Sequence, residues 1–329
     1  MGTLRKHTPT QGRNTAVYMA LLPKGERTAP VVQTLVAGGF TGSVTITAAT
    51  STESYVAVVA GTAHTVVAGT TDTKKTIAKA LVASINAGTT GAKALNLRLS
   101  GSDYRFDVYR ATTFTLANTG TTTVGSLTVS TITGAGTGAA VGATSITLPV
   151  ATLGKIAAGQ FLQFVDSNGV ETLAELTATA AAGATTLSVA ALPEAISTSA
   201  IALYPPEFTD RDNASLPDKF NWSGFKTFNT GGFEDAAFTG ASADFDAAGI
   251  YYEFCPVYQT LSKTGPEGRE HWLTIQFDSP KEGWTGRKRE AVVGLDSRDQ
   301  PVKVDGFISA NFKGKVLSAP VETPAILDV

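Results

Sequence analysis

The feature that most constrains this chain is a phrase that occurs twice. "GATSITLPVA" begins at Gly142 and "GATTLSVAAL" begins at Gly183, and the copies continue to similar apolar segments, "GQFLQF" and "SAIALY". Each copy predicts two short strands around a Pro or Gly turn, because β-branched residues favour extended backbone. Two copies cannot make a solenoid, which needs at least about three repeats. The phrase therefore predicts a small β domain over residues 137–204, built from two similar hairpins.

The composition around the repeat is that of a mainly β protein with little charge. Charged residues make up 16% of the 329 positions, against a usual share of about 25%. Thr, Ser, Ala and 33 Gly fill the difference. Thr and Val suit half-buried strands, and Gly suits tight turns. Because obligate interfaces are depleted in charge, this composition indicates that much of the surface faces other protein.

Composition also divides the chain into segments. Residues 1–36 begin with a polar arm, "MGTLRKHTPTQGRN", and continue into the apolar strand "AVYMALLP". Residues 37–136 are β-rich with one helix, at about 72–87. After the repeat domain, residues 205–329 begin with a proline-punctuated linker and hold all three tryptophans and most of the charged residues.

Two periodic stretches predict the clearest elements. Ile77, Leu81 and Ile85 recur four apart, which is the spacing of one helix face. The stretch "PVKVDGFISANFKGKVL" alternates apolar and polar positions, which predicts a long strand over 302–316 with one buried and one wet face. The apolar positions of that strand are Val302, Val304, Ile308, Ala310, Phe312 and Val316, and its wet face carries Lys303, Lys313 and Lys315.

The sequence contains none of the common catalytic or metal-binding motifs. His7, His64 and His271 have no ligand-like spacing with one another or with Cys255. G-x-S-x-G, H-E-x-x-H and Walker sequences are absent. The single cysteine lies in "YYEFCPVY" and is expected to be a buried small hydrophobe. We therefore expect no enzyme activity, no cofactor and no metal.

Charge excludes a strong nucleic-acid binder. The net charge is −2 and the pI is about 6.0, so no basic field holds phosphates by counterion release. No apolar run approaches the roughly 18 residues of a membrane span, and we expect no membrane partner. Acidic residues cluster in "GGFEDAAFTGASADFDAAG", which reads as a solvated loop. They are Glu234, Asp235, Asp244 and Asp246.

Two segments resemble structural proteins of tailed bacteriophages. "AGATTLSVAALPEAI" is similar to a segment that recurs in phage tail proteins, and "HTVVAGTTDTKKTIAKALVASINAG" is similar to another, a strand followed by a capped helix. Together they cover less than half of the chain. With the β-rich C-terminal part, the chain resembles a tail tube (major tail) protein carrying inserted β domains.

This resemblance implies a tail-tube-like β-sandwich or barrel core and a role in assembly. Such subunits form hexameric rings that stack around a DNA-conducting channel, so the partners would be other copies, other tail proteins and DNA as non-specific cargo. The core would combine residues 1–36 with 205–329, and 37–204 would be displayed outside. The location implied is the virion tail, after synthesis in the bacterial host cytoplasm.

Particular residues follow from that expectation. The N-terminal arm, with Arg5 and Lys6, is a candidate for contacts between rings. The amphipathic strand is a candidate for closing the ring, through Val302, Val304, Ile308 and Phe312. The four acidic residues of the 234–246 region are candidates for lining the lumen.

Two other functions remain open from the sequence. A capsid decoration protein or head–tail connector would share the charge-poor β composition, and it would form trimers or rings that do not stack. A glycan-binding or glycan-cleaving adhesin would use exposed tryptophans and the 234–246 carboxylates.

Overall fold

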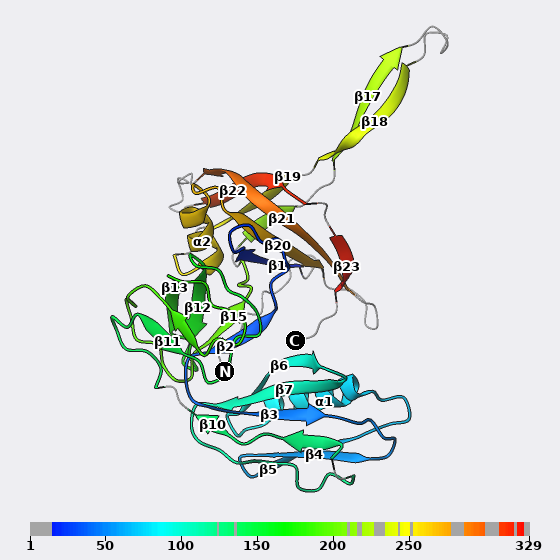
Figure 1. The fold of residues 1–329 in the computed structure, drawn as a ribbon, viewed down its shortest axis with the longest axis vertical. Helices are drawn as coiled ribbons and strands as arrows, with labels where there is room; N and C mark the ends of the chain where they lie inside the picture. The colour runs from blue at the N-terminus through cyan, green and yellow to red at the C-terminus, as the bar shows by residue number, and fades with distance from the viewer. Residues whose placement is uncertain are drawn as a thin grey trace. The chain divides into compact units, whose positions relative to one another are not determined.

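The computed structural model of the chain describes residues 15–123, 125–134, 137–208, 211–215, 219–226, 234–242, 244–250, 253–277, 286–299, 309–318 and 321–325. The chain divides into two compact units. Unit 1 contains Val31–Pro205, and unit 2 combines the described chain before Val31 with Pro206–Ile326. Both are mainly β, which confirms the predicted fold class, and the described strands form open antiparallel sheets rather than a closed barrel (Figure 1).

The unit boundary differs from the predicted one by a single strand. Strand β2 (Gln33–Val36) falls within the segment 1–36 that the sequence assigns to the core, yet it pairs with β15 (Ile201–Tyr204) in unit 1. The reason is burial, because Leu35 and Val36 are almost fully enclosed there.

The first part of unit 1 encloses one helix between two sheets. The larger sheet has the order β10-β3-β7-β6, with β9 also on β3, and the smaller has the order β5-β4-β8. Helix α1 contacts strands of both. Its elements are β3 (Phe40–Ile46), β4 (Ser54–Val59), β5 (Thr62–Val67), α1 (Lys74–Ala87), β6 (Lys93–Ser100), β7 (Asp103–Arg110), β8 (Leu116–Ala117), β9 (Leu127–Val129) and β10 (Thr133–Gly134).

Helix α1 lies where its periodicity predicts. Thr73 caps it, accepting a hydrogen bond from the backbone N–H of Thr76, whose hydroxyl in turn accepts from the N–H of Thr73. Ile77, Leu81 and Ile85 are fully buried in the core between the sheets. At about 1.5–3 kcal/mol for each buried apolar side chain, this face holds the helix in place.

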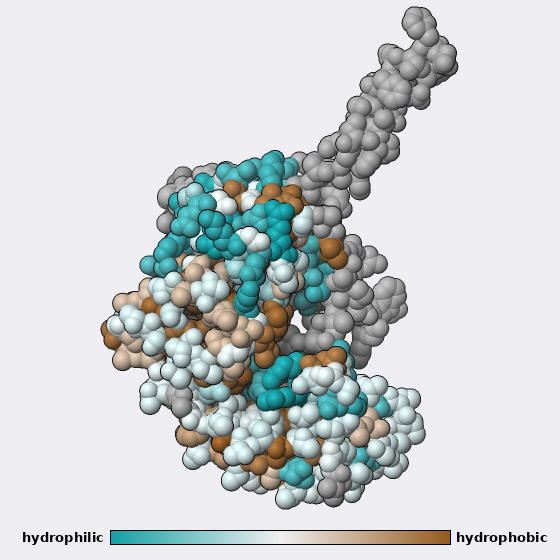
Figure 2. Space-filling view, viewed as in Figure 1, coloured by the Kyte–Doolittle hydropathy of each residue, from teal (hydrophilic) through white to brown (hydrophobic). Residues whose placement is uncertain are grey.

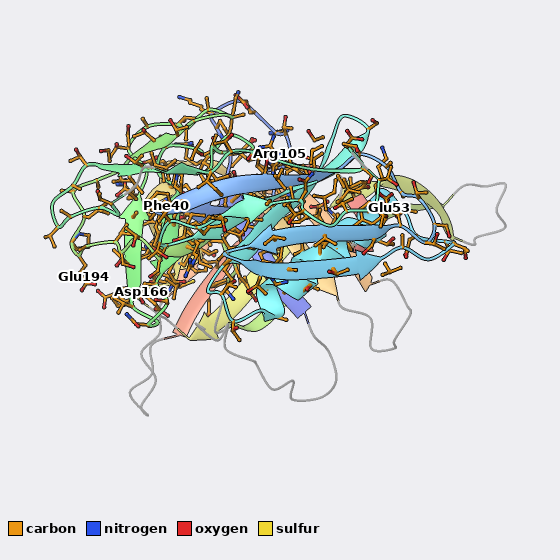
Figure 3. All side chains as sticks on the ribbon, turned by 90° about the horizontal axis from the view of Figure 1, so that it is seen from below. Phe40, Glu53, Arg105, Asp166 and Glu194 are labelled. Atoms are coloured by element: carbon orange, nitrogen blue, oxygen red, sulfur yellow. The ribbon has the colours of Figure 1, made fainter. Side chains whose placement is uncertain are left out.

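A buried carboxylate joins two loops of this part. Glu53 lies immediately before β4 (Figure 3). It is 4% exposed and accepts hydrogen bonds from the Ser126 hydroxyl and the Thr123 backbone N–H. Burial raises the pKa of the Glu53 carboxyl, but hydrogen bonds from Ser126, Tyr55 and Thr123 outweigh it and hold the pKa below its usual value.

The repeated phrases form the second part of unit 1, and they pair with each other. Strand β11 (Ser145–Thr147) lies antiparallel to β14 (Thr186–Ser188), with Ile146 opposite Leu187. The backbone bonds that flank this pair are reciprocal: Leu148 N–H donates to Thr185, and Val189 N–H donates to Thr144. The copies are therefore related by an approximate two-fold axis and do not form the two hairpins that the sequence predicts. This arrangement buries Ile146 and Leu187 at paired positions.

The second strand of each copy pairs with a different part of the chain. In the first copy, β12 (Phe161–Val165) pairs with the strand that follows it, β13 (Glu171–Glu175). In the second copy, β15 pairs with β2, which lies far upstream. The four strands form one sheet of order β13-β12-β15-β2. Residues 33–36 thus occupy the position in the second copy that β13 occupies in the first.

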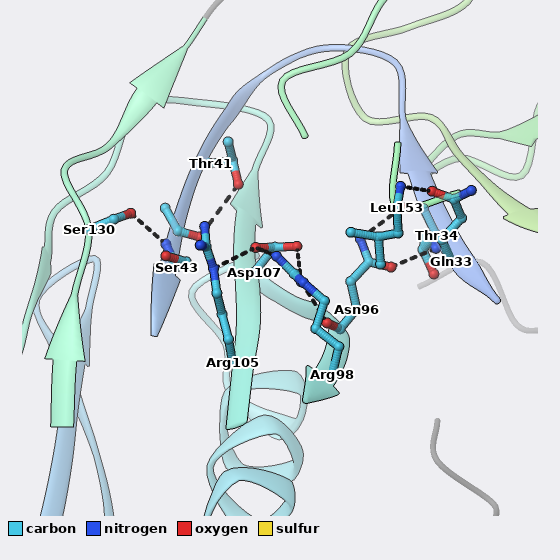
Figure 4. Close-up of polar contacts among 11 residues, drawn as sticks. Gln33, Thr34, Thr41, Ser43, Asn96, Arg98, Arg105, Asp107, Ser130 and Leu153 are labelled. Atoms are coloured by element: carbon cyan, nitrogen blue, oxygen red, sulfur yellow. Dashed lines mark hydrogen bonds and ion pairs between the residues drawn. The ribbon is translucent and has the colours of Figure 1, made fainter. Parts of the chain in front are cut away.

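Polar contacts connect the two parts of unit 1 (Figure 4). Asn96, at a bulge of β6 with φ +55°, accepts from the Thr34 backbone N–H at 2.7 Å and donates to the Thr34 carbonyl at 3.1 Å. The buried Gln33 side chain accepts from the Leu153 N–H at 2.6 Å. The Tyr109 hydroxyl donates to the Thr198 carbonyl. Strand β2 is therefore bound on both sides, by β15 and by the Asn96 amide.

Unit 2 is built on one seven-stranded sheet. Its order is β1-β20-β21-β22-β19-β16, and β23 pairs with β21 beyond the end of β22. The elements are β1 (Thr15–Leu21), β16 (Arg211–Ser215), β17 (Lys219–Lys226), β18 (Glu234–Ser242), β19 (Asp244–Ile250), α2 (Pro256–Thr264), β20 (Glu270–Phe277), β21 (Gly286–Asp299), β22 (Ser309–Val316) and β23 (Val321–Ala325).

Helix α2 covers one face of this sheet. Val257, Tyr258 and Leu261 pack into the same core as strand residues from β1, β19, β20, β21 and β22. Cys255 is 2% exposed in this core, as its apolar surroundings predict. Pro256 starts the helix, where a missing N–H costs nothing.

Charge is unequally divided between the units. Residues 31–205 contain 16 of the chain's 54 charged residues, although they make up more than half of its length. Figure 2 shows the same contrast on the visible face, with pale surface over much of unit 1 and strongly hydrophilic residues concentrated over unit 2.

Candidate functional site: the edge ribbon and the open sheet face

The edge of the unit 2 sheet continues as a two-stranded ribbon. Ser215 lies opposite Asp246 in the β16–β19 pair, and Lys219 lies opposite Ser242 in the β17–β18 pair. The partner numbers add to the same total in both pairs, so one register runs through both. We call β16, β17, β18 and β19 together the edge ribbon, and β17 with β18 the ribbon arm (Figure 1).

Among the described residues, the ribbon arm has no third strand beside it. Strands β17 and β18 form a sheet of their own, and at eight residues β17 spans about 26 Å. An isolated two-stranded ribbon is marginal in water, because it buries too little surface to offset its ordering entropy. The arm therefore needs a further surface to pack against in order to be stable.

The sequence of the arm is typical of a segment that binds another protein. Six of the 24 positions from 219 to 242 are aromatic, against 8% in the whole chain, and the register places Trp222 opposite Phe238. Aromatic residues are enriched where proteins bind one another.

The two outer edges of the sheet differ. At β1, the Met19 N–H donates to the Pro206 carbonyl and the Phe208 N–H donates to the Val17 carbonyl, so the chain after unit 1 covers this edge. At the other edge, β16 pairs with β19 alone among the described strands. Pairing with a further strand is therefore possible on the side that carries the ribbon.

The sheet face opposite α2 is the second candidate surface, and we call it the open face. Alternation assigns residues to it, because their neighbours in each strand are in the core. They include Tyr18, Trp272, Thr274, Lys288, Glu290, Lys313, Lys315, Asp244 and Asp246, together with Val292, which is buried. The half-buried Trp272 lies between Ala20 and Val292 in the register, and both of these neighbours are buried.

Ion pairs join the charges of the open face. Lys315 Nζ is 2.8 Å from Asp244 Oδ1 and 3.8 Å from Asp296 Oδ2. Lys288 Nζ is 3.0 Å from Glu290 Oε2, and Glu290 also accepts from the Thr274 hydroxyl at 3.1 Å. A hydrogen bond from the Lys315 ammonium to Asp244 raises the pKa of this lysine, so it stays charged and paired.

At the margin of this face, Arg27 forms a two-point ion pair with Glu270. Its Nε and Nη2 lie 2.8 and 2.5 Å from the two carboxylate oxygens. The hydrogen bond from Arg27 holds the pKa of Glu270 below its usual value. A shallow pocket of about 640 Å³ lies beside this pair, lined by the chain after Leu22 and by the turn before β20. Arg27 and Glu270 therefore neutralise each other.

The predicted assembly residues have different outcomes. Arg5, Lys6, Val302, Val304 and Ile308 lie outside the described residues. Phe312 is described, and its side chain lies in the core of its own unit. It is fully buried, and its ring meets Tyr258 edge-on at 5.5 Å and Phe208 at 6.2 Å. The alternation correctly identified its apolar face, but α2 covers that face.

The predicted acidic loop is also corrected. Residues 234–242 and 244–250 are strands, because the Gly and Ala positions fit the closely paired ribbon. Glu234 and Asp235 lie opposite Lys226 and Phe225 at the far end of the arm. Asp244 and the half-buried Asp246 lie on the open face, in register with Lys315 and Lys313.

The sequence reasoning did not single out Trp272, Glu290 or Lys288 for this face. The alternation in "HWLTIQF" provided a signal, since it places Trp272 and Thr274 opposite the core positions. Their convergence with Glu290 depends on the β20–β21 register, which short-range patterns do not determine.

The described residues contain no group of three His, Cys, Asp or Glu side chains placed to hold a metal ion. His64 and His271, both buried, lie in different units. None of the helices in the described part of the chain is long and apolar enough to cross a membrane.

Comparisons with known proteins find little. No protein-family model matches the chain, and no curated protein matches it. Among solved structures, the chain is similar to one described as the tail of an empty GTA particle with C6 symmetry, at 15% identity and a TM-score of 0.27. The match covers 35% of this chain and 82% of that chain. A TM-score this low does not establish a shared fold.

Proposed function

We propose that this chain is a structural subunit of a phage-like tail tube, which assembles with copies of itself into stacked, hexameric rings around a DNA channel. The ribbon arm carries the proposal. The arm continues the edge of the sheet, and no other described strand pairs with it. It is also rich in aromatic residues. A neighbouring subunit would supply the missing surface.

Two further features support assembly. The two phage-like segments of the sequence are structured elements of unit 1, namely α1 with β5 and the second copy of the repeat. The low charge of unit 1 suits a protein with much of its surface against other protein. The sixfold ring and the virion location derive from the resemblance to tail tube proteins.

The test is negative-stain electron microscopy of the concentrated protein, with and without the ribbon arm. In the deletion variant, residues 218–243 are replaced by Asn-Gly, a two-residue turn that keeps the register of Ser215 with Asp246. We expect stacked rings with an open channel from the wild-type chain and only free subunits from the deletion variant. Near-ultraviolet circular dichroism of Trp272 would verify that unit 2 still folds.

A matched control replaces the exposed turn Ser167–Gly169 of unit 1 by the same Asn-Gly, and this variant should still form tubes. A wild-type chain that remains monomeric at high concentration would contradict the proposal. Trimers, or rings that do not stack, would instead favour a capsid decoration or connector protein. Tubes formed by the deletion variant would show that the ribbon arm is not the assembly contact.

A further inference from the structure

We propose that unit 1 of each subunit docks against unit 1 of the next subunit through surfaces of opposite charge, so that the copies of unit 1 form a ring of their own. This inference rests on the proposed tube function, which brings copies of the chain side by side. It concerns residues that neither the ribbon arm nor the unit 2 sheet involves. The partner that it names is a second copy of this chain.

Unit 1 is neutral as a whole, but its charges are divided between its two parts. Residues 31–136 contain seven cations and four carboxylates, which gives a net charge of +3. Residues 137–205 contain one lysine and four carboxylates, which gives a net charge of −3. Solubility is served as well by interspersed charges, so the separation indicates two surfaces that attract each other between molecules.

Three cations of the first part lie on one face of its larger sheet. Phe106 and its alternate neighbours on β7 point into the core, so the register places Lys93, Arg98 and Arg105 on the opposite face. We call this the basic face. Arg98 binds both oxygens of Asp107, at 2.6 and 3.0 Å (Figure 4). Arg105 lies opposite Arg98 in the register, and its Nε is 3.8 Å from the same carboxylate.

One carboxylate therefore serves two guanidinium groups. Like charges directly opposite each other in a sheet are destabilising, and Arg98 already occupies both oxygens of Asp107. The Arg105 side chain is 41% exposed, so its guanidinium can be reached from outside. A carboxylate supplied by another molecule would complete the group, since Arg and carboxylate form the stronger, charge-assisted kind of hydrogen bond.

The second part of unit 1 holds its carboxylates at a different place. Glu171 and Glu175 lie on the same face of β13, since they are four positions apart along the strand. Figure 3 shows Asp166 and Glu194 well separated from Arg105 within unit 1. One subunit therefore does not bring its own acidic surface to its basic face, and each surface is left for a different neighbour.

Two different, complementary surfaces on one unit produce a head-to-tail contact. Contacts of this kind close into a ring when the rotation between copies allows it, which is the symmetry of the proposed tube. Exposed charge pairs are individually weak, at about 0–1 kcal/mol each. The tube compensates for this weakness, because it holds neighbouring copies of unit 1 at an effective concentration on the order of 1 mM.

Cysteine labelling tests whether the basic face is covered. The one natural cysteine is buried, so an introduced cysteine can be labelled selectively. Thr128→Cys reports the basic face, because the exposed Thr128 pairs with Thr45, which pairs with Arg105. Thr65→Cys, at an exposed position of β5 in the smaller sheet, is the matched control. The reagent is a maleimide attached to a polyethylene glycol chain, and labelled subunits are counted on a denaturing gel.

In free subunits, both cysteines should react at similar rates. In tubes, Thr128→Cys should react roughly tenfold more slowly, because the effective concentration makes even a weak contact persist, and Thr65→Cys should react as before. Raising the salt from about 50 to 500 mM should remove the protection, since it shortens the range of charge attraction. Equal reactivity of Thr128→Cys in tubes and free subunits would overturn this inference and leave the tube function intact. Absence of tubes would remove the basis of both.

Charge reversal tests the partner. Lys93→Glu/Arg105→Glu makes both surfaces of unit 1 acidic, and Glu171→Lys/Glu194→Lys makes both basic. Tubes of either variant alone, each carrying Thr128→Cys, should lose the protection. Tubes assembled from an equal mixture should regain it, because each reversed surface then meets its opposite. Calorimetry of the free subunits would verify that unit 1 still folds in both variants.

Two results would contradict the proposed partner. Protection that persists in tubes of the single variants would show that these charges do not form the contact. Protection of free wild-type-charge subunits by dextran sulfate, with none in tubes alone, would assign the basic face to an anionic polymer instead of a second copy.

Discussion

The buried His271 makes the stability of unit 2 sensitive to acid, and this effect can be calculated. Its side chain has no solvent exposure, and its Nε2 is 2.9 Å from the Thr264 hydroxyl of α2. Its Nδ1 has no hydrogen-bond partner. Burial, with a smaller contribution from Arg269, lowers the pKa of His271 from 6.5 to about 4.

The sign follows from linkage. The folded state disfavours the imidazolium, so the stabilisation is fully present above the unfolded pKa of about 6.5 and is lost as the pH falls towards the folded pKa of about 4. At 1.36 kcal/mol per pKa unit, unit 2 should lose about 2 kcal/mol by pH 5 and about 3 kcal/mol by pH 4 from this residue alone.

The assay is urea unfolding followed by tryptophan fluorescence at a series of pH values. All three tryptophans lie in unit 2, so the signal reports that unit without interference from unit 1. The matched variant is His271→Gln, which stays neutral and can still bond Thr264. Its free energy of unfolding should fall between pH 7 and 5 by about 2 kcal/mol less than that of the wild type. Parallel pH profiles for the two proteins would refute the reasoning.

Two further predictions concern unit 1. Ile146→Ala and Leu187→Ala should each lower its free energy of unfolding by about 2–5 kcal/mol, and by similar amounts, because both residues are fully buried at paired positions of the repeat; calorimetry would measure this, and a large loss in only one variant would contradict the two-fold arrangement. Glu53→Gln should cost about 1–3 kcal/mol, since it weakens the bonds from Ser126 and Thr123. Because the folded pKa of Glu53 is depressed, this stabilisation is present above the unfolded pKa and is lost as the pH falls through the folded pKa, so the difference between variant and wild type should shrink in acid.

Local patterns predicted the elements that are defined by residues close together in the sequence. The fourfold spacing of Ile77, Leu81 and Ile85 located α1, because a helix face is defined by nearby residues. The same reasoning missed α2, where Val257, Tyr258 and Leu261 have the spacing of a helix but follow the strand-like "YYEF". Pro256 at the first position of the helix was a usable signal.

Pairing between distant segments was beyond local patterns. The repeat indicated two equivalent strand pairs, but no nearby residue shows that the copies pair with each other or that Gln33–Val36 completes the second. The Gly and Ala residues around 234–246 suggested a loop, since small residues are common in loops. A long register with many cross-strand bonds overrode that preference.

The position of β2 has a consequence for the order of synthesis. Gln33 and its partner Tyr204 are 171 positions apart, and at roughly 5–20 residues per second the ribosome needs on the order of 10–30 s to produce the second after the first. During that interval the first copy of the repeat can already pair with β13, while an apolar segment that includes Val31, Val32, Leu35 and Val36 waits without its neighbour strand. The nascent chain therefore exposes an unpaired apolar strand until Ile201–Tyr204 has been synthesised. A chaperone that binds this segment would act before any subunit meets another.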